Sequence, residues 1–224
     1  LLKGMPMSEE QQMFAKDPSF VANWTVADRS HITLLETIKN AKATVLFGVT
    51  GQSGAFNEEI LKAMAANDPQ AMIMPISNPT IKAEATPEQV VAAAGPNVLI
   101  ATGSPFKPVK VEGGEKIISQ CNNLYIFPGV GLGALISGTP KVTDEMFMAA
   151  SQALSDLVSA EDLKAGRMLP RIDKIRYVSA QVALAVAREA RRSGLGVRAD
   201  DERLLQMVMN AMWEPKYLPF RLPE

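Results

Sequence analysis

The sequence has little of several residue types that define common classes of protein. Its 224 residues include one cysteine, Cys121, and one histidine. A lone cysteine excludes an internal disulfide and a cysteine-based metal site, and with no signal peptide in view it predicts a reducing, cytoplasmic location. Because 23 Lys and Arg balance 24 Asp and Glu, no basic excess predicts binding to nucleic acid. No apolar run reaches the roughly 20 residues of a membrane span.

What is present is typical of an ordinary globular domain. Hydrophobic residues make up 47% of the chain, which is enough to build a packed core. The first residues are Leu-Leu-Lys rather than Met, so we expect the chain to be processed or to be part of a longer polypeptide. Some of the functional machinery is then expected outside it.

Three short apolar runs predict the strands of one parallel sheet. They occupy residues 43–47, 71–76 and 98–101. None of them alternates with polar residues, which is typical of strands buried on both faces of a parallel sheet. Helical patterns at 57–66 and from Pro87 onward separate the runs, so the order predicts right-handed βαβ units. Pro75, inside the second run, argues against a central position for that part of the strand.

Beyond residue 120 the sheet is predicted to end, and the chain is predicted to become helical after Gly133. Residues 124–127 read as a short β-rich run, which Pro128 and Gly129 then stop. Helical patterns follow at 143–157, from 159, at 175–190 and at 200–212. The predicted fold class is α/β: the later half of a Rossmann-like, doubly wound parallel sheet followed by a helical C-terminal extension. The expected divisions are residues 1–127, 128–195 and 196–224, the last being a helix and an irregular tail.

Neutral polar residues follow the predicted strands. Gly48 begins a glycine-containing loop, Asn78 follows the second strand, Gly103 follows the third, and Asn122 and Asn123 stand side by side. Ligands of an open parallel sheet bind outside the carboxyl ends of its strands, so these residues predict a binding rim. Amides orient a carboxylate or a hydroxyl without adding charge. An Asx-turn that satisfies its own backbone is the alternative explanation for the amide pair.

The same loops lack the groups that most enzymes use for proton transfer. They contain no carboxylate pair and no Ser-His-Asp arrangement. The loop at 48–54 is glycine-rich enough to approach a dinucleotide, although it is not G-x-G-x-x-G and fits a plain tight turn equally well. The residues alone therefore predict a part that binds cofactor or substrate without its own acid and base.

Several motifs together resemble the malic enzyme family. They are Ser-Asn-Pro-Thr at 77–80, Ala-Thr-Gly-Ser-Pro-Phe at 101–106, Cys-Asn-Asn-Leu-Tyr-Ile-Phe-Pro-Gly at 121–129, Gly-Val-Thr-Gly at 48–51 and Glu-Ala-Thr-Pro-Glu at 84–88. The likeness runs from the first residues to about Arg192. It implies oxidative decarboxylation of L-malate to pyruvate and CO2, with NAD or NADP, a divalent metal ion (Mg or Mn) and assembly as a homodimer or homotetramer.

The resemblance also implies roles for single residues. Substrate binding falls on Asn78, Asn122 and Asn123. The cofactor-side residues are Gly48, Val49, Thr50, Gly51, Asn78, Gly103 and Asn122. The family's catalytic tyrosine, lysine base and acidic metal ligands all precede the point at which this chain begins. We therefore expect no catalytic residue and no metal ligand here, and no turnover of malate by these residues without the missing N-terminal part of the same polypeptide.

Cofactor choice and two other functions stay open at this stage. Residues 8–15, which lie near the cofactor ribose in the family, carry two glutamates and no Lys or Arg. NADP would need a base near its extra phosphate, so we expect NAD. A malolactic enzyme, which releases lactate, would share the same motifs. A non-catalytic assembly segment, whose helices after Thr143 bury surface against another part or subunit, is the alternative of a different class.

Overall fold

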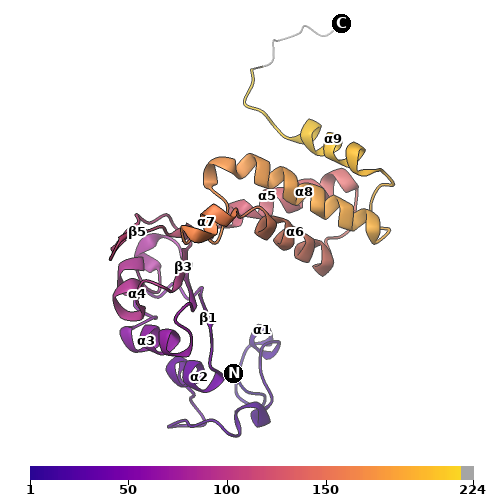
Figure 1. Ribbon diagram of the computed structural model, residues 1–224. Coiled ribbons are helices and arrows are strands. Elements are labelled where there is room, and N and C mark those ends of the chain that lie inside the picture. Colours follow the sequence, from indigo (N-terminus) through magenta and orange to yellow (C-terminus); the bar gives the residue numbers. More distant parts are fainter. Residues whose placement is uncertain (218–224) are drawn as a thin grey trace, which may run out of the picture.

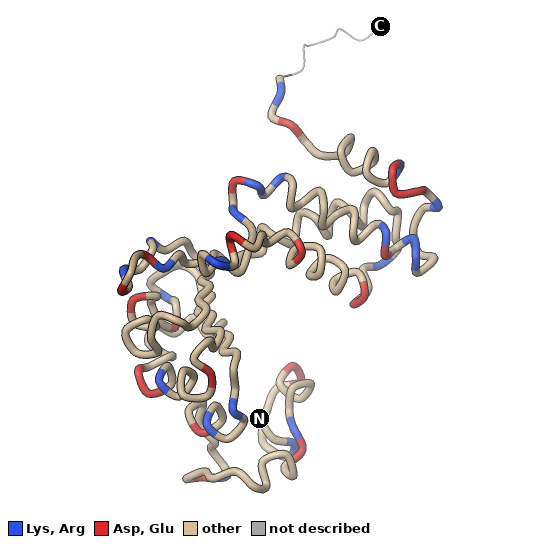
Figure 2. The backbone as a smooth tube through the Cα atoms, in the orientation of Figure 1, with Lys and Arg blue, Asp and Glu red and all other residues tan. Residues whose placement is uncertain are grey.

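The computed structural model describes residues 1–217, so the end of the predicted tail, 218–224, lies outside the described residues. The chain forms a sheet-containing part, followed by a helical part that extends away from one end of the sheet (Figure 1). Lys, Arg, Asp and Glu are interspersed along both parts (Figure 2). Within residues 1–217, every helix is too short or too polar to cross a membrane.

The predicted parallel sheet is present. Its strands are β1 (Val45–Gly48), β2 (Met72–Pro75), β3 (Leu99–Thr102) and β6 (Ser119–Gln120), in the order β1-β2-β3-β6. All three neighbouring pairs are parallel, and Ile73 lies opposite both Leu46 and Ile100. The α/β class and the three predicted strands are therefore confirmed.

Three helices lie along one side of this sheet (Figure 1). They are α2 (Leu34–Ala41), α3 (Glu58–Asn67) and α4 (Pro87–Ala94). Thr33 and Thr86 begin α2 and α4 with capping boxes, and the Asn57 side chain accepts a hydrogen bond from the Ile60 N–H at the start of α3. The apolar sides of the helices pack on the strands in one core, whose fully buried members include Leu61, Met64, Ile73, Val90 and Ile100.

The prediction of strands buried on both faces is wrong for the outer strand. Leu46 of β1 faces the helices and is buried, whereas Val45 and Phe47 are each 55% exposed. Successive side chains of a strand point to opposite faces, and α2, α3 and α4 cover only one of them. The apolar run therefore predicted the strand correctly, but it wrongly predicted that both faces of the strand are buried.

Pro75 does not move β2 to the edge of the sheet, contrary to the argument from its sequence. β2 lies between β1 and β3. Pro75 is its last residue, and the paired residues of β2 and β3 end at Ile73 and Ile100. Pro75 therefore lies beyond the last paired residues of β2 and β3, and its lack of an N–H removes no hydrogen bond between these strands.

The predicted strand at 124–127 is also wrong. Asn123–Tyr125 form a 3-10 helix, η3, and α5 (Phe127–Ser137) follows directly. Pro128 lies in the first turn of α5, where its missing N–H and fixed φ suit a helix. The strand in this region is β6, which precedes the amide pair instead of following it, and the helical part begins at Phe127 rather than after Gly133.

The remaining elements are short or belong to the helical part. The predicted helices there are confirmed as α6 (Asp144–Asp156), α7 (Ala160–Lys164), α8 (Ile175–Arg192) and α9 (Asp201–Ala211). α8 packs against α5, α6 and α9. A hairpin of β4 (Val109–Val111) and β5 (Gly114–Lys116) was not predicted. The short helices are α1 (Glu9–Gln12), η1 (Pro18–Val21), η2 (Thr80–Lys82) and η4 (Ile172–Lys174).

Candidate functional site

The loops that follow the four parallel strands meet at one edge of the sheet. Since parallel strands all point the same way, their carboxyl ends and the loops after them share that edge. Residues 48–54, 76–79, 102–106 and 119–123 include no Lys, Arg, Asp, Glu or His. The edge therefore offers neutral hydrogen-bonding groups: amides, hydroxyls and glycine backbone.

Hydrogen bonds join two of the predicted amides to one segment. The Ser104 hydroxyl donates to Asn78 Oδ1. The Asn122 Nδ2 group donates to the Gly103 carbonyl at 3.4 Å, and the Gln120 Nε2 group donates to the same oxygen at 3.2 Å. Asn78 and Asn122 thus lie on either side of residues 103–104. The peptide bond that follows Asn78 is cis.

Gly103 permits this close approach of the two loops. A Cβ atom at position 103 would lie 2.1 Å from the Ile76 carbonyl oxygen and 3.0 Å from Asn78 Nδ2. The first distance is far inside van der Waals contact and involves backbone, so any side chain would force the segment at 76–78 to move. Glycine at position 103 therefore allows Asn78 to pack directly against the loop after β3.

The two adjacent amides have different surroundings. Asn122 Oδ1 accepts a hydrogen bond from the Leu124 N–H at 3.0 Å and so caps η3. The Asx-turn, which was the alternative explanation for the pair, is therefore present at Asn122 and uses its side-chain oxygen. The NH2 group of Asn122 remains available and donates to the Gly103 carbonyl. Asn123 is the first residue of η3 and is exposed. The hydrogen bonds that link Asn78, Gly103 and Asn122 do not include it.

The loop after β1 is held by Glu84, which begins the motif at 84–88 but for which the sequence predicted no role of its own. Glu84 is fully buried, and its Oε1 atom accepts hydrogen bonds from the Thr50 N–H at 2.7 Å, the Thr50 hydroxyl at 2.8 Å and the Ser77 hydroxyl at 2.6 Å. Burial by itself would raise the pKa of Glu84, but the hydrogen bonds from Ser77 and Thr50 lower it below its ordinary value of 4.5. In the sequence, Glu84 is recognisable only as a single acidic residue between two alanines.

The glycines of this loop divide into one packed and two open positions. A Cβ atom at Gly48 would lie 2.6 Å from Phe56 and 2.7 Å from Glu84, so Gly48 packs on the core. Gly51 and Gly54 have φ of +66° and +79°, and no atom lies within 4 Å of a Cβ built on either. Their backbone is therefore open to a ligand.

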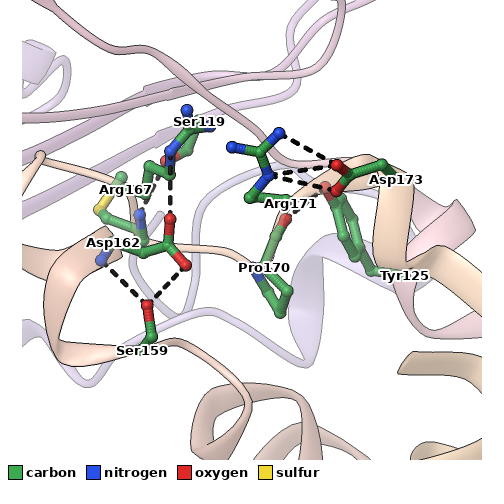
Figure 3. A network of polar contacts seen from close by, with 9 residues as sticks. Ser119, Tyr125, Ser159, Asp162, Arg167, Pro170, Arg171 and Asp173 are labelled. Atoms are coloured by element: carbon green, nitrogen blue, oxygen red, sulfur yellow. Dashed lines mark hydrogen bonds and ion pairs between the residues drawn. The ribbon is translucent and has the colours of Figure 1, made fainter. Parts of the chain in front are cut away.

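Hydrogen bonds to the segment before η4 hold the chain in place before and after the amide pair (Figure 3). The Met168 N–H donates to the Ser119 hydroxyl at 2.7 Å, just before the pair. The Tyr125 hydroxyl, just after it, donates to the Pro170 carbonyl at 2.8 Å. Burial raises the pKa of Tyr125, so the phenol stays a neutral donor. Both ends of the amide segment are thus fixed to residues 168–170.

No metal centre accompanies the edge in the part of the chain that the structure describes. Residues 1–217 contain no group of three or more His, Cys, Asp or Glu side chains that could hold a metal ion. Burial raises the pKa of the Cys121 thiol next to the amide pair, which disfavours a thiolate ligand. The residues present therefore do not fit a divalent ion.

Comparison with known proteins places these observations in a family. Residues 2–191 match the family model described as malic enzyme, NAD binding domain. The chain is 40% identical over 222 residues to an NAD-dependent malic enzyme of Pseudomonas savastanoi pv. phaseolicola, which covers 99% of this chain and 39% of that protein. It is 43% identical over 211 residues to the enzyme of the same name from Acinetobacter baylyi, which covers 94% and 37%.

Solved structures agree with the sequence comparison. The malic enzyme from Pyrococcus horikoshii Ot3 superposes with a TM-score of 0.61 at 27% identity over 79% of this chain and 36% of that chain. The Entamoeba histolytica malic enzyme gives 0.66 at 23% identity over 83% and 35%, which supports the fold alone. The chain thus spans well under half the length of the relatives that it matches. On these grounds the chain belongs to the malic enzyme family, and residues 2–191 correspond to the NAD-binding domain of that family.

Proposed function

We propose that this chain is the cofactor- and substrate-binding C-terminal part of an NAD-dependent malic enzyme, a malate dehydrogenase (decarboxylating). The whole enzyme converts L-malate to pyruvate and CO2 and reduces NAD. The observation that carries the proposal is the neutral edge on which Asn78 and Asn122 flank Gly103. The names of the relatives supply the reaction, and the matched family model supplies the cofactor.

The residues at the edge fit the nicotinamide end of the cofactor. A carboxamide has both donors and an acceptor, and the uncharged amides and open glycine backbone of the edge complement both kinds of group. We assign cofactor binding to Gly48, Val49, Thr50, Gly51, Asn78, Gly103 and Asn122. Asn78, Asn122 and Asn123 are assigned to the substrate. NAD held by these residues would supply the acceptor for a hydride from C2 of malate. The residues of this chain would hold the two reactants in register.

Other parts of the reaction are assigned outside this chain. Its neutral edge has no acid or base, so proton transfer belongs to the missing N-terminal part of the same polypeptide. A divalent ion, Mg or Mn, would polarise the keto group for loss of CO2, and its ligands are also assigned to that part. We keep the divisions at 1–127, 128–195 and 196–224 and assembly as a homodimer or homotetramer as proposals.

The proposal favours NAD over NADP. Residues 8–15 contain α1 (Glu9–Gln12), a short helix that is exposed and whose first turn is acidic. An acidic segment near the ribose would repel the extra phosphate of NADP. A complete enzyme that prefers NADP would contradict this part of the proposal.

The experiment uses the complete enzyme that contains this chain. Asn78→Ala and Asn123→Ala should each lower kcat/KM for malate by about 10- to 100-fold, the effect of losing a hydrogen bond to a charged group. Asn210→Ala, an identical change on the exposed side of α9, serves as the matched control. Unchanged kinetics in the first two variants would remove these residues from the site.

Two further measurements complete the test. Product analysis of the complete enzyme should find pyruvate, whereas lactate would indicate the malolactic reaction. The 224 residues by themselves should give no NADH from malate. Steady NADH production by them would show that the chain carries its own acid, base and metal site.

A further inference from the structure

We propose that Glu84 is a positioning residue: its carboxylate fixes the loop after β1 and Ser77 in the arrangement that binds the cofactor. Glu84 lies outside this edge, on the segment between η2 and α4, and does not belong to the residues assigned to cofactor or substrate above. The inference rests on the proposed function, because the loop that Glu84 fixes is the one assigned to the cofactor.

One oxygen atom organises the contact. Oε1 of Glu84 accepts three hydrogen bonds, two from Thr50 and one from Ser77, at 2.6 to 2.8 Å. Thr50 follows β1 and Ser77 follows β2, so a single carboxylate joins the loops of two neighbouring strands. Hydrogen bonds to an ionised acceptor are about twice as strong as those between neutral groups.

The charge of Glu84 also sets the direction of the next hydrogen bond. An ionised carboxylate can only accept, so the single hydroxyl proton of Ser77 is committed to Glu84. The lone pairs of the Ser77 oxygen are then free, and they accept the Gly51 N–H at 2.9 Å. Glu84 thereby controls the backbone of Gly51, which it does not touch. Asn78 is the residue after Ser77 in the chain.

The second oxygen shows that the hydrogen bonding of this carboxylate is concentrated at Oε1. Oε2 is buried and has no hydrogen-bond partner among the described residues. It lies against Gly48, where a Cβ atom would be 2.8 Å away. The hydrogen bonds that offset the cost of burying this charge are therefore those from Thr50 and Ser77 to Oε1. What the carboxylate supplies is the fixed geometry of Thr50, Gly51 and Ser77.

The kinetic test compares two Glu→Gln variants of the complete enzyme. Glu84→Gln keeps the shape but removes the charge, and the KM for NAD should rise about tenfold with a smaller change in kcat, as for the loss of one charge-assisted bond. Glu88→Gln, in the exposed first turn of α4, is the matched control and should leave both constants unchanged. Ser77→Ala keeps the charge of Glu84 but breaks the link to Gly51, and it should raise the same KM.

A second readout does not depend on turnover. Hydrogen exchange of the Thr50 and Gly51 amides should become about tenfold faster in Glu84→Gln, and that of Gly51 in Ser77→Ala, while Glu88→Gln behaves as the native protein. If exchange and the KM for NAD match the control, or if kcat alone falls, the positioning role of Glu84 is refuted. Faster exchange in an enzyme that does not oxidise malate would support the contact and refute the proposed function instead.

Discussion

Glu84 links the stability of the site to pH. Its pKa in the folded chain lies below 4.5, because the hydrogen bonds from Ser77 and Thr50 outweigh the effect of burial. Unfolding exposes the carboxyl group and returns its pKa to about 4.5. A carboxyl group with a lowered pKa stabilises the fold only when ionised. Its contribution is complete above about pH 4.5 and is lost as the pH falls through the lower, folded-state pKa.

This reasoning predicts the pH dependence of one variant. The free energy of unfolding of the native chain, minus that of Glu84→Gln, should decrease when the pH is lowered from about 7 to about 3. Urea unfolding followed by circular dichroism at a series of pH values measures this difference. Glu88→Gln, treated in the same way, gives the background from an exposed glutamate. A difference that stays constant or grows on acidification would contradict the prediction.

Single residues of the site were predictable to different degrees. Asn78 and Gly103 follow strands that can be recognised by composition, so their meeting at one edge follows from parallel topology. Glu84 could not be identified in this way, because glutamate is rarely buried. Its burial depends on Thr50 and Ser77 arriving from two other loops, a contact that no local pattern encodes.

Helix α5 shows how neighbouring glycines in one element differ. A Cβ atom at Gly129 would lie 2.6 Å from Val182 Cβ, and one at Gly133 would lie 2.6 Å from the Ala183 carbonyl, both on α8. At Gly131 no atom would lie within 4 Å. Gly129 and Gly133 therefore allow α5 and α8 to approach closely, whereas Gly131 only loosens the helix.

Three Gly→Ala variants test this difference. Gly129→Ala and Gly133→Ala should each lower the free energy of unfolding by about 1–3 kcal/mol, because the added methyl group overpacks the contact. Gly131→Ala should raise it by about 0.5–1 kcal/mol through helix propensity. Urea unfolding measures all three. Equal shifts would show that propensity, and not packing between α5 and α8, determines the effect.

The elements that were predicted correctly carry their signals locally. Thr86 and Pro87 mark the start of α4 by cap and fixed φ, and the apolar runs mark β1, β2 and β3. The prediction of a strand at 124–127 failed because aromatic and β-branched residues there favour a strand by composition, whereas the structure forms η3 and the start of α5, which packs on α8. The hairpin of β4 and β5 was missed because each strand has only three residues.

At the scale of the whole molecule, the sheet and the helical part have separate cores. The core residues under the sheet and those around α8 form distinct clusters. The hydrogen bond from the Met168 N–H to the Ser119 hydroxyl joins β6 of the sheet to the loop before η4. Such a contact between distant residues positions the two parts, and it could not be predicted from sequence patterns that describe one element at a time.

This link predicts a matched pair of serine variants. Ser119→Ala should lower the free energy of unfolding by about 1–3 kcal/mol, because Ser119 is buried and the Met168 N–H loses its acceptor. Ser151→Ala, on the exposed side of α6 where the hydroxyl bonds to its own helix, should change it by less than about 0.5 kcal/mol. Urea unfolding decides the comparison. If both variants lower the free energy of unfolding by the same amount, the hydrogen bond from Met168 to Ser119 does not stabilise the contact between the sheet and the helical part.

The outer strand has a practical consequence for experiments on this chain alone. Within residues 1–217, β1 pairs only with β2, so its other side offers unpaired N–H and carbonyl groups beside the half-exposed Val45 and Phe47. Two molecules that meet along such an edge can extend one sheet into the other. Affinity titrations with the isolated 224 residues therefore have to be repeated across a dilution series, because self-association would compete with ligand for the same protein.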